Sequence, residues 1–189
     1  MIIYNYMYWS LMPSTITWRD KYELLKFILF SDRFTNGPKV REFEEVWSKW
    51  IGAKHSLYVS SGSTANLLLV AAVKELYNIP NGAKVLLPAC TWVTNVSPII
   101  QLGLEPVFCD ISLDHFSFNM DALPDVDVRI VFITHLLGID APVEKMKDRW
   151  PNAIFIEDIC ESHGVEGPTG ERRGASSSLA STFSFYYGH

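Results

Sequence analysis

The stretch VRIVFIT, residues 128–134, carries apolar side chains on both faces, which is typical of a strand buried inside a parallel sheet. Shorter runs of the same kind recur along the chain, at residues 56–60, 84–88, 105–110, 153–157 and 179–185. Between them lie segments with apolar residues at helical spacing, at residues 64–77, 92–102 and 142–150. This alternation predicts an α/β fold, with a mostly parallel sheet and helices on both of its faces.

Two more helices are expected before the first of these strands, at residues 19–30 and 39–51, with a break at residues 34–38. Gly52 has the position of a C-terminal cap for the second helix. That helix carries an apolar stripe, which we interpret as core packing rather than as a ligand site. The stripe consists of Val40, Phe43, Val46, Trp47 and Trp50.

Composition limits the classes of protein to which the chain can belong. Apolar residues make up 48% of its 189 residues, enough for one sizeable core, and the formal net charge is −5. No basic tract suggests nucleic-acid binding, and no apolar run is long enough for a membrane span. Residues 1–9 are aromatic and lack the basic segment and cleavage site of a signal peptide. Three widely spaced cysteines without a CxxC pair indicate neither a zinc site nor disulfides, and they predict a cytoplasmic protein.

Ligands bind beyond the carboxyl ends of the strands in sheets of this kind, so the residues after each strand are the candidate site. The run SSGSTAN, residues 60–66, follows a predicted strand and opens a helix. Backbone N–H groups at such a turn form a phosphate site, to which the hydroxyls of Ser61, Ser63 and Thr64 would add donors. A serine that only caps the helix explains the run equally well. No Walker lysine and no GxGxxG is present, so nucleotide-binding motifs fit poorly.

Two further strand ends carry candidate residues. Trp92, shortly after the second predicted strand, offers a flat face to a ring, although a core tryptophan is the commoner role. Carboxylates after residues 153–157 are costly unless they are paired, and Asp158 is the candidate to hold a protonated ring nitrogen. The alternatives are a helix cap or a metal site built from Glu157, Asp158, Glu161 and His163. We favour the ring and predict no metal.

Taken together, these stretches resemble the DegT/DnrJ/EryC/StrS family of sugar aminotransferases and dehydratases, which are fold-type I pyridoxal-phosphate enzymes. The resemblance covers residues 37–189 and rests on Gly37-Pro38 with Val40 and Phe43-Glu44, Ser61-Gly62-Ser63, Pro88 with Thr91-Trp92, Glu157-Asp158, and Phe183-Ser184-Phe185. It implies that residues 1–36 form an N-terminal arm and first helix. Residues 37–189 would be the N-terminal portion of the pyridoxal-phosphate-binding large domain, with its C-terminal part missing.

The resemblance also assigns a role to matching positions around pyridoxal 5'-phosphate or its amine form, pyridoxamine 5'-phosphate. Gly62 and Ser63 match the backbone contacts to the cofactor phosphate, and Ser184 matches a side-chain contact to it. Trp92 matches the aromatic residue stacked on the pyridine ring. Asp158 matches the carboxylate that pairs with the protonated pyridine nitrogen and makes the ring an electron sink.

His189 stands six residues after Phe183, where the aminotransferases carry the lysine that binds the cofactor covalently. Glu161 falls where they usually carry a glutamine near the ring hydroxyl. These two residues, with the run at residues 60–67, resemble the C3-dehydratase branch of the family. Because an imidazole cannot bind the cofactor as a lysine does, the cofactor would be held non-covalently. The resemblance implies that His189 is the catalytic base in removing the C3 hydroxyl from a nucleotide-linked 4-keto-6-deoxy sugar, with glutamate as the amino donor.

Two alternatives remain open. The chain is a nucleotide-sugar 4-aminotransferase of the perosamine or viosamine type if an insertion moves its lysine to directly after His189. It is an inactive fragment or a partner-binding subunit if the site has been lost, against which Asp158, Trp92 and the Ser-Gly-Ser turn argue. Family members continue well beyond His189. We therefore expect the 189-residue chain to be poorly soluble and weakly active alone, and the full-length form to be a homodimer.

Overall fold

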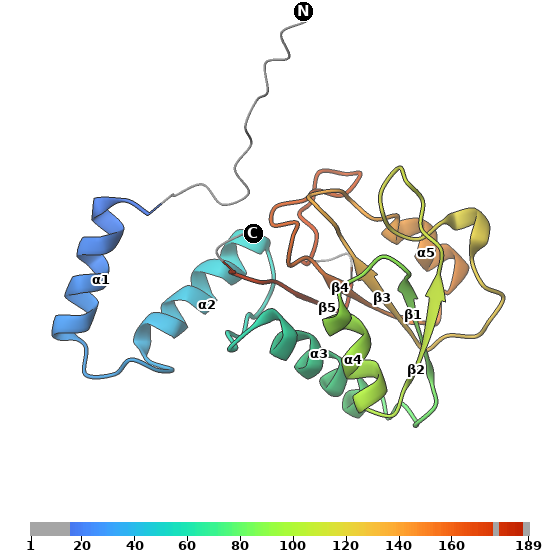
Figure 1. The fold of residues 1–189 in the computed structure, drawn as a ribbon, viewed down its shortest axis with the longest axis horizontal. Helices are drawn as coiled ribbons and strands as arrows, with labels where there is room; N and C mark the ends of the chain where they lie inside the picture. Colours follow the sequence, from blue (N-terminus) through green and yellow to red (C-terminus); the bar gives the residue numbers. More distant parts are fainter. Residues whose placement is uncertain (1–15, 176–177, 187–189) are drawn as a thin grey trace, which may run out of the picture.

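The computed structural model describes residues 16–175 and 178–186, and within them a five-stranded sheet forms the centre of the molecule (Figure 1). All pairs of neighbouring strands in this sheet are parallel. Their order across the sheet is β2 (Glu105–Cys109), β1 (Lys84–Pro88), β3 (Ile130–Thr134), β4 (Ile154–Asp158) and β5 (Ala180–Thr182). Because parallel strands end at the same edge, the residues that follow them are brought together there. The predicted parallel sheet is confirmed.

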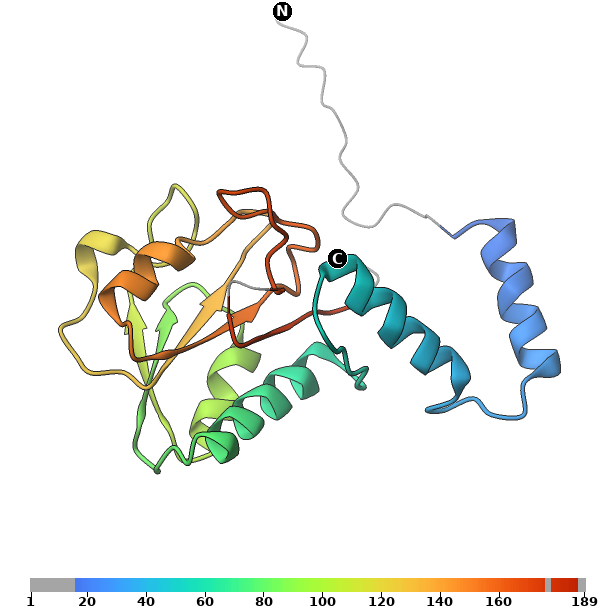
Figure 2. The same ribbon diagram turned by 180° about the vertical axis from the view of Figure 1, so that it is seen from behind.

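Helices cover both faces of this sheet, as Figures 1 and 2 show from opposite sides. One face carries α3 (Gly62–Leu76) and α4 (Val93–Gln101), and the other carries α5 (Val143–Arg149). Successive side chains of a strand point to opposite faces, so each strand contributes to both cores. In β3, Ile130 and Phe132 pack with the α3 and α4 side, whereas Val131 and Ile133 pack with α5. The α/β class predicted from the sequence is therefore confirmed.

Two helices precede the sheet, and their ends follow from local sequence signals. The first, α1 (Trp18–Phe30), begins at a capping box formed by Thr17 and Asp20. The second, α2 (Pro38–Ile51), has proline at its first position and ends at Gly52, whose φ of 84° suits a glycine. The predicted cap at Gly52 is confirmed. Figure 1 shows α1 standing apart from the α/β body, to which α2 connects it.

Aromatic rings attach α2 to the α/β body. The ring of Trp47 lies 5.1 Å from that of Phe183 and 4.7 Å from that of Phe185, edge to face in both pairs. Phe43 lies 4.9 Å from Phe185 in the same geometry, which is favourable for aromatic pairs. The predicted packing role is confirmed for Phe43 and Trp47, whereas Val46 and Trp50 of the same stripe are exposed.

The outer face of α1 is apolar, and no described residue covers it: Trp18, Tyr22, Leu25 and Ile28 are all exposed. We expect the 189-residue chain to self-associate through this face, because contiguous apolar patches are buried by association. A variant with Leu25→Lys and Ile28→Lys should shift the average mass in light scattering toward the monomer. Asn152→Lys adds charge on an exposed turn of the body and should leave the mass unchanged. An α1 variant with the wild-type mass would contradict the expectation.

The strand predicted at residues 56–60 is absent, so that prediction is wrong. These residues pair with no described strand, and Leu57 and Tyr58 are 73% and 51% exposed. A strand forms only where a neighbour supplies the hydrogen bonds of a ladder. Residues of this segment and of β5 line the same hollow, but the two segments are not paired. The strand expected at residues 179–185 is also shorter, because β5 pairs with β4 alone.

The remaining elements differ little from expectation. Pro98 lies inside α4 without ending it, and α4 is one residue shorter at each end than predicted. A single 3-10 turn, η1 (Met120–Ala122), lies between β2 and β3. Within the described ranges, no helix is both long and apolar enough to cross a membrane.

Candidate active site

A hollow of about 1320 Å³ lies at the carboxyl edge of the sheet, bounded by α2, the start of α3 and the chain around β5. Six residues that the sequence assigned to a cofactor line it: Gly62, Ser63, Trp92, Asp158, Glu161 and Ser184. They follow different strands or begin different helices, so the topology of the sheet brings them together. The proposed base His189 lies outside the described residues.

The phosphate-binding turn predicted from the sequence forms the first turn of α3. Ser61 is the N-cap, and its hydroxyl oxygen accepts the Thr64 N–H at 3.1 Å, so the capping role is confirmed. The hydroxyls of Ser61 and Thr64 also bond to each other at 2.9 Å. The first N–H groups of any α-helix have no acceptor within the helix, so those of Gly62 and Ser63 remain suited to an anion. Capping and anion binding are therefore compatible at this turn.

Gly62 is packed tightly between two other parts of the hollow. A Cβ atom at this position would lie 3.3 Å from Cys160 Sγ and 3.3 Å from Ser184 Cβ. Ser184 Oγ would be 3.6 Å away, so its hydroxyl lies beside the start of α3. The glycine thus lets the chain after β5 approach the helix end, where a phosphate would meet both.

Gly62→Ala should therefore weaken both folding and phosphate binding. We expect a loss of about 1 kcal/mol in the free energy of unfolding, because the added methyl overpacks the contact with Cys160 and Ser184. Urea denaturation measures this loss, and the dissociation constant for pyridoxamine 5'-phosphate should rise in parallel. The wild type is the reference for both measurements. A G62A variant as stable as the wild type would count against this packing argument.

Asp158, at the end of β4, is 4% exposed and is held by two donors. The Cys160 N–H donates to its Oδ1 at 2.9 Å, and Asn66 Nδ2 donates to its Oδ2 at 3.0 Å. A carboxylate has about four acceptor sites, so Asp158 keeps capacity for a further donor in the hollow. Burial, together with the negative charge of Asp158, raises the pKa of Cys160 far above its usual value. The Cys160 thiol is therefore protonated at neutral pH and is not a nucleophile.

The other two predicted residues stand at the rim of the hollow. Trp92 is the N-cap residue of α4 and is 63% exposed. A core role for this tryptophan, the commoner alternative, is therefore wrong. Glu161 is partly buried, three residues beyond Asp158. Both residues line the hollow.

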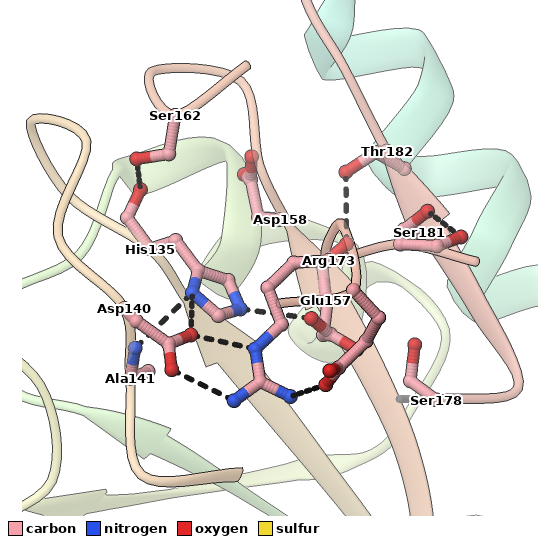
Figure 3. Close-up of polar contacts among 12 residues, drawn as sticks. His135, Asp140, Ala141, Glu157, Asp158, Ser162, Arg173, Ser178, Ser181 and Thr182 are labelled. Carbon is pink, nitrogen blue, oxygen red and sulfur yellow. Dashed lines mark hydrogen bonds and ion pairs between the residues drawn. The ribbon is translucent and has the colours of Figure 1, made fainter. Parts of the chain in front are cut away.

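A charge network joins His135, which lines the hollow, to Glu157 and, through Asp140, to Arg173 (Figure 3). His135 Nε2 and Glu157 Oε2 are 2.8 Å apart, and both side chains are fully buried. The second ring nitrogen, Nδ1, faces Asp140 Oδ1 at 3.4 Å. The buried Arg173 donates to both oxygens of Asp140, at 2.6 and 2.7 Å, and to those of Glu144, at 2.6 and 3.0 Å. Each buried charge in the network is thus paired.

The network shifts the pKa values of its members in opposite directions. Burial lowers the pKa of His135, but its hydrogen bonds to Asp140 and Glu157 outweigh burial and leave it above its ordinary value. Nδ1 accepts the Ala141 N–H at 3.2 Å in the neutral ring and faces Asp140 once protonated. Burial raises the pKa of Asp140, but hydrogen bonds from His135 and Arg173 outweigh this and leave it lowered. A hydrogen bond from Arg173 lowers the pKa of Glu144.

These shifts predict a stability maximum in mildly acidic solution. The lowered pKa values of Asp140 and Glu144 add stability that is lost as the pH falls through their folded-state values. The raised pKa of His135 adds stability that is complete below about pH 6.5 and is lost as the pH rises through its folded-state value. In urea denaturation, the free energy of unfolding should peak between about pH 4.5 and 6.5. His135→Gln should abolish only the decrease on the alkaline side, and equal alkaline slopes in both proteins would refute this account.

Three of the four residues of the alternative metal site make other contacts in the described part of the chain. The side chain of Glu157 bonds to His135, and that of Asp158 bonds to Asn66. His163 packs against the rings of Trp47, Phe183 and Phe185. In the part of the chain that the structure describes, no three His, Cys, Asp or Glu side chains gather as a metal requires.

The sequence reasoning missed the polar residues around Asp158, which lie in helices and strands or, for His135, directly after β3. They are Asn66, Asn95, Thr134, His135 and Thr182, all buried. The available signal was a polar side chain within an otherwise apolar segment, as Asn66 is among the alanines and leucines of α3. Such residues are buried only when they are hydrogen-bonded, which marks them as part of a network.

The sequence model of the DegT/DnrJ/EryC1/StrS aminotransferase family matches residues 17–189. GDP-4-keto-6-deoxy-D-mannose 3-dehydratase of Escherichia coli O55:H7 is 30% identical over 181 residues, which are 92% of this chain and 46% of that protein. The chain therefore spans about half the length of the curated relatives that it matches.

Solved structures of 3-dehydratases are also similar to this chain. The E. coli GDP-4-keto-6-deoxy-D-mannose-3-dehydratase with bound hydrated PLP is similar with a TM-score of 0.86 and 30% identity, over 96% of this chain and 48% of that one. A structure of GDP-4-keto-6-deoxymannose-3-dehydratase with a trapped PLP-glutamate geminal diamine gives 0.85 and 30%, over 95% and 48%.

Proposed function

This chain belongs to the DegT/DnrJ/EryC1/StrS aminotransferase family, and we propose that it forms the cofactor site of a pyridoxal-phosphate-dependent 3-dehydratase. Its substrate would be a nucleotide-linked 4-keto-6-deoxy sugar, and the E. coli relative named for GDP-4-keto-6-deoxy-D-mannose supports that class. One observation carries the proposal. The six described residues that the sequence assigned to this cofactor line a single hollow at the carboxyl edge of the sheet.

The hollow fits pyridoxamine 5'-phosphate in the chemistry of its donors and acceptors. The backbone N–H groups of Gly62 and Ser63, with the Ser184 hydroxyl beside Gly62, suit the phosphate. Asp158 offers the carboxylate that a protonated ring nitrogen needs, and the exposed Trp92 offers a flat face to the ring. Glu161, at the same hollow, is proposed to bond to the ring hydroxyl.

The residues of this chain would then divide the work as follows. When bound, the cofactor supplies an amine that condenses with the C4 ketone of the sugar and a ring that takes up electrons. Asp158 keeps the proton on the ring nitrogen. His189 would accept a proton from C4′, the carbon that carries the amine, and would donate it to the C3 hydroxyl, which would leave as water. An imidazole suits both steps because it ordinarily titrates near neutral pH.

The overall change removes one oxygen from the sugar, which requires two electrons. We propose that glutamate supplies them together with its amino group and leaves as 2-oxoglutarate, while the amino nitrogen is released as ammonia. The PLP-glutamate adduct trapped in a similar structure supports this donor.

We also propose that the protein acts as a homodimer in the cytoplasm. The exposed apolar face of α1 supports the homodimer. The free thiols of Cys90, Cys109 and Cys160 support the cytoplasm, where thiols stay reduced.

The test is to incubate the protein with GDP-4-keto-6-deoxymannose, pyridoxamine 5'-phosphate and glutamate, and to analyse the sugar by mass spectrometry. A dehydratase gives a sugar that has lost one oxygen, with one 2-oxoglutarate for each sugar. A 4-aminotransferase gives an amino group in place of the ketone, and this result would replace the proposal with that alternative. A folded, cofactor-binding protein that forms neither product would support the inactive alternative.

A further inference from the structure

Asn66 is buried in the second turn of α3, a helix otherwise rich in alanine, leucine and valine. Its side chain is 1% exposed, and an amide at such a position is costly unless its hydrogen bonds are made. The same helix begins at Ser61 and Gly62, the turn proposed to bind the cofactor phosphate. Asn66 thus connects that turn with whatever its amide bonds to.

The amide reaches three other elements of the fold. Its Oδ1 accepts the hydroxyl of Thr182, in β5, at 2.6 Å. Its Nδ2 donates to Asp158 Oδ2, in β4, at 3.0 Å and to Asn95 Oδ1, in α4, at 2.8 Å. The carboxylate of Asp158 accepts and does not donate, so only this orientation of the amide gives it a donor. The Thr182 hydroxyl, which donates to Oδ1, therefore fixes which end of the amide faces Asp158.

Asn95 is held in turn by hydrogen bonds to two threonines. Its Nδ2 donates to Thr91 Oγ1 and to Thr134 Oγ1, each at 3.0 Å, and those two hydroxyls are 2.7 Å apart. Thr134 is the last residue of β3, and its Cα partner in the sheet is Asp158. The ends of β3, β4 and β5 are therefore tied to α3 and α4 around one amide. A satisfied network of this kind specifies one arrangement of its members.

We infer that Asn66, oriented by Thr182, is a positioning residue that holds the Asp158 carboxylate toward the ring nitrogen of the bound cofactor. The inference rests on the proposed function, since it requires the cofactor to occupy the hollow. Asn66 bonds to one carboxylate oxygen and the Cys160 N–H bonds to the other, so the carboxylate group cannot rotate without losing a bond. Because the same helix carries the phosphate turn, the amide also sets the distance between the two ends of the cofactor site.

Four variants test this inference through the dissociation constant for pyridoxamine 5'-phosphate and the absorption band of the bound cofactor. Asn66→Leu keeps the size of the side chain and removes its bonds, and it should weaken binding about tenfold or more. Thr182→Val removes only the hydroxyl and should weaken binding several-fold. Thr182→Ser restores the hydroxyl and should return binding to within about twofold of wild type. The double variant of N66L with T182V should bind no more weakly than N66L, since both changes break one chain of bonds.

Ser117→Ala is the matched control, because the buried Ser117 hydroxyl has no hydrogen-bond partner among the described residues. It should leave both readouts unchanged. If N66L fails to fold, as circular dichroism would show, the comparison of T182V with T182S decides the question. The absorption band of N66L should move toward that of the free cofactor, which a loss of general stability would not produce.

Two results would overturn the inference, and they are distinguishable from each other. If the wild type binds the cofactor and N66L and T182V bind it equally well with an unchanged band, Asn66 has no positioning role while the proposed function stands. If the wild type does not bind the cofactor, the proposed function and the inference fail together.

Discussion

Asp158→Asn should lower the rate of sugar deoxygenation by on the order of a hundredfold or more. The substitution keeps the shape of the side chain but removes the negative charge that would hold a proton on the ring nitrogen. Without that proton the ring takes up electrons poorly, so the transition state loses its main electrostatic support. Either Asn66 or the Cys160 N–H would also face an amide NH₂ instead of a carboxylate oxygen.

The rate should be measured at saturating cofactor, so that weaker binding and slower chemistry are separated. Asp125→Asn is the matched control, since Asp125 is exposed and pairs only with Arg149 at the surface among the described residues. It should retain the wild-type rate. A D158N variant with more than half of that rate would exclude Asp158 from the role proposed for it.

In the full-length form, His189→Lys should likewise reduce deoxygenation by about a hundredfold or more, the usual contribution of a general base. The lysine would bind the cofactor covalently, which borohydride reduction followed by mass spectrometry of the protein detects. His189→Gln is the companion variant, because it removes the base without supplying an amine. It should lose the rate equally and show no covalent cofactor. Undiminished C3 deoxygenation in H189K would show that His189 is not the base.

The helices and central strands could be predicted because the spacing of their apolar residues follows which side chains are buried. Residues 128–134 and 153–157 are apolar on both faces, and the structure buries them between α3 and α4 on one side and α5 on the other. Helix ends were equally visible, since Gly52 has the left-handed conformation that its place after the helix indicated. The periodicity of side chains therefore sufficed for the layers of the fold.

Residues 56–60 could not be predicted correctly from the periodicity of their side chains. Leu57, Tyr58 and Val59 have the residue types of a strand, but the backbone needs a partner at hydrogen-bonding distance. Whether such a partner exists depends on the rest of the sheet and not on these five residues. The same holds for β5, which extends only as far as its pairing with β4.

Some residues of the candidate site could likewise be predicted from the sequence, and others could not. Trp92, Asp158 and Glu161 could be found because they lie at the end of a strand or shortly after it, and parallel strands all end at one edge. Asn66 and Thr182 could not, because their importance depends on a bond between residues 116 positions apart in the chain. No local spacing reports that contact, which appears only when α3 packs against the end of the sheet.

The high pKa of Cys160 has a practical consequence for labelling. Cys109 is buried and its pKa is also raised, by burial, so both thiols should react more slowly with a maleimide than an exposed thiol does. Cys90 is exposed and lies two residues before Trp92, which lines the hollow. A fluorescent maleimide should therefore attach at Cys90 in the unmodified sequence. Its emission would report the arrival of a ligand at Trp92 without any engineered cysteine.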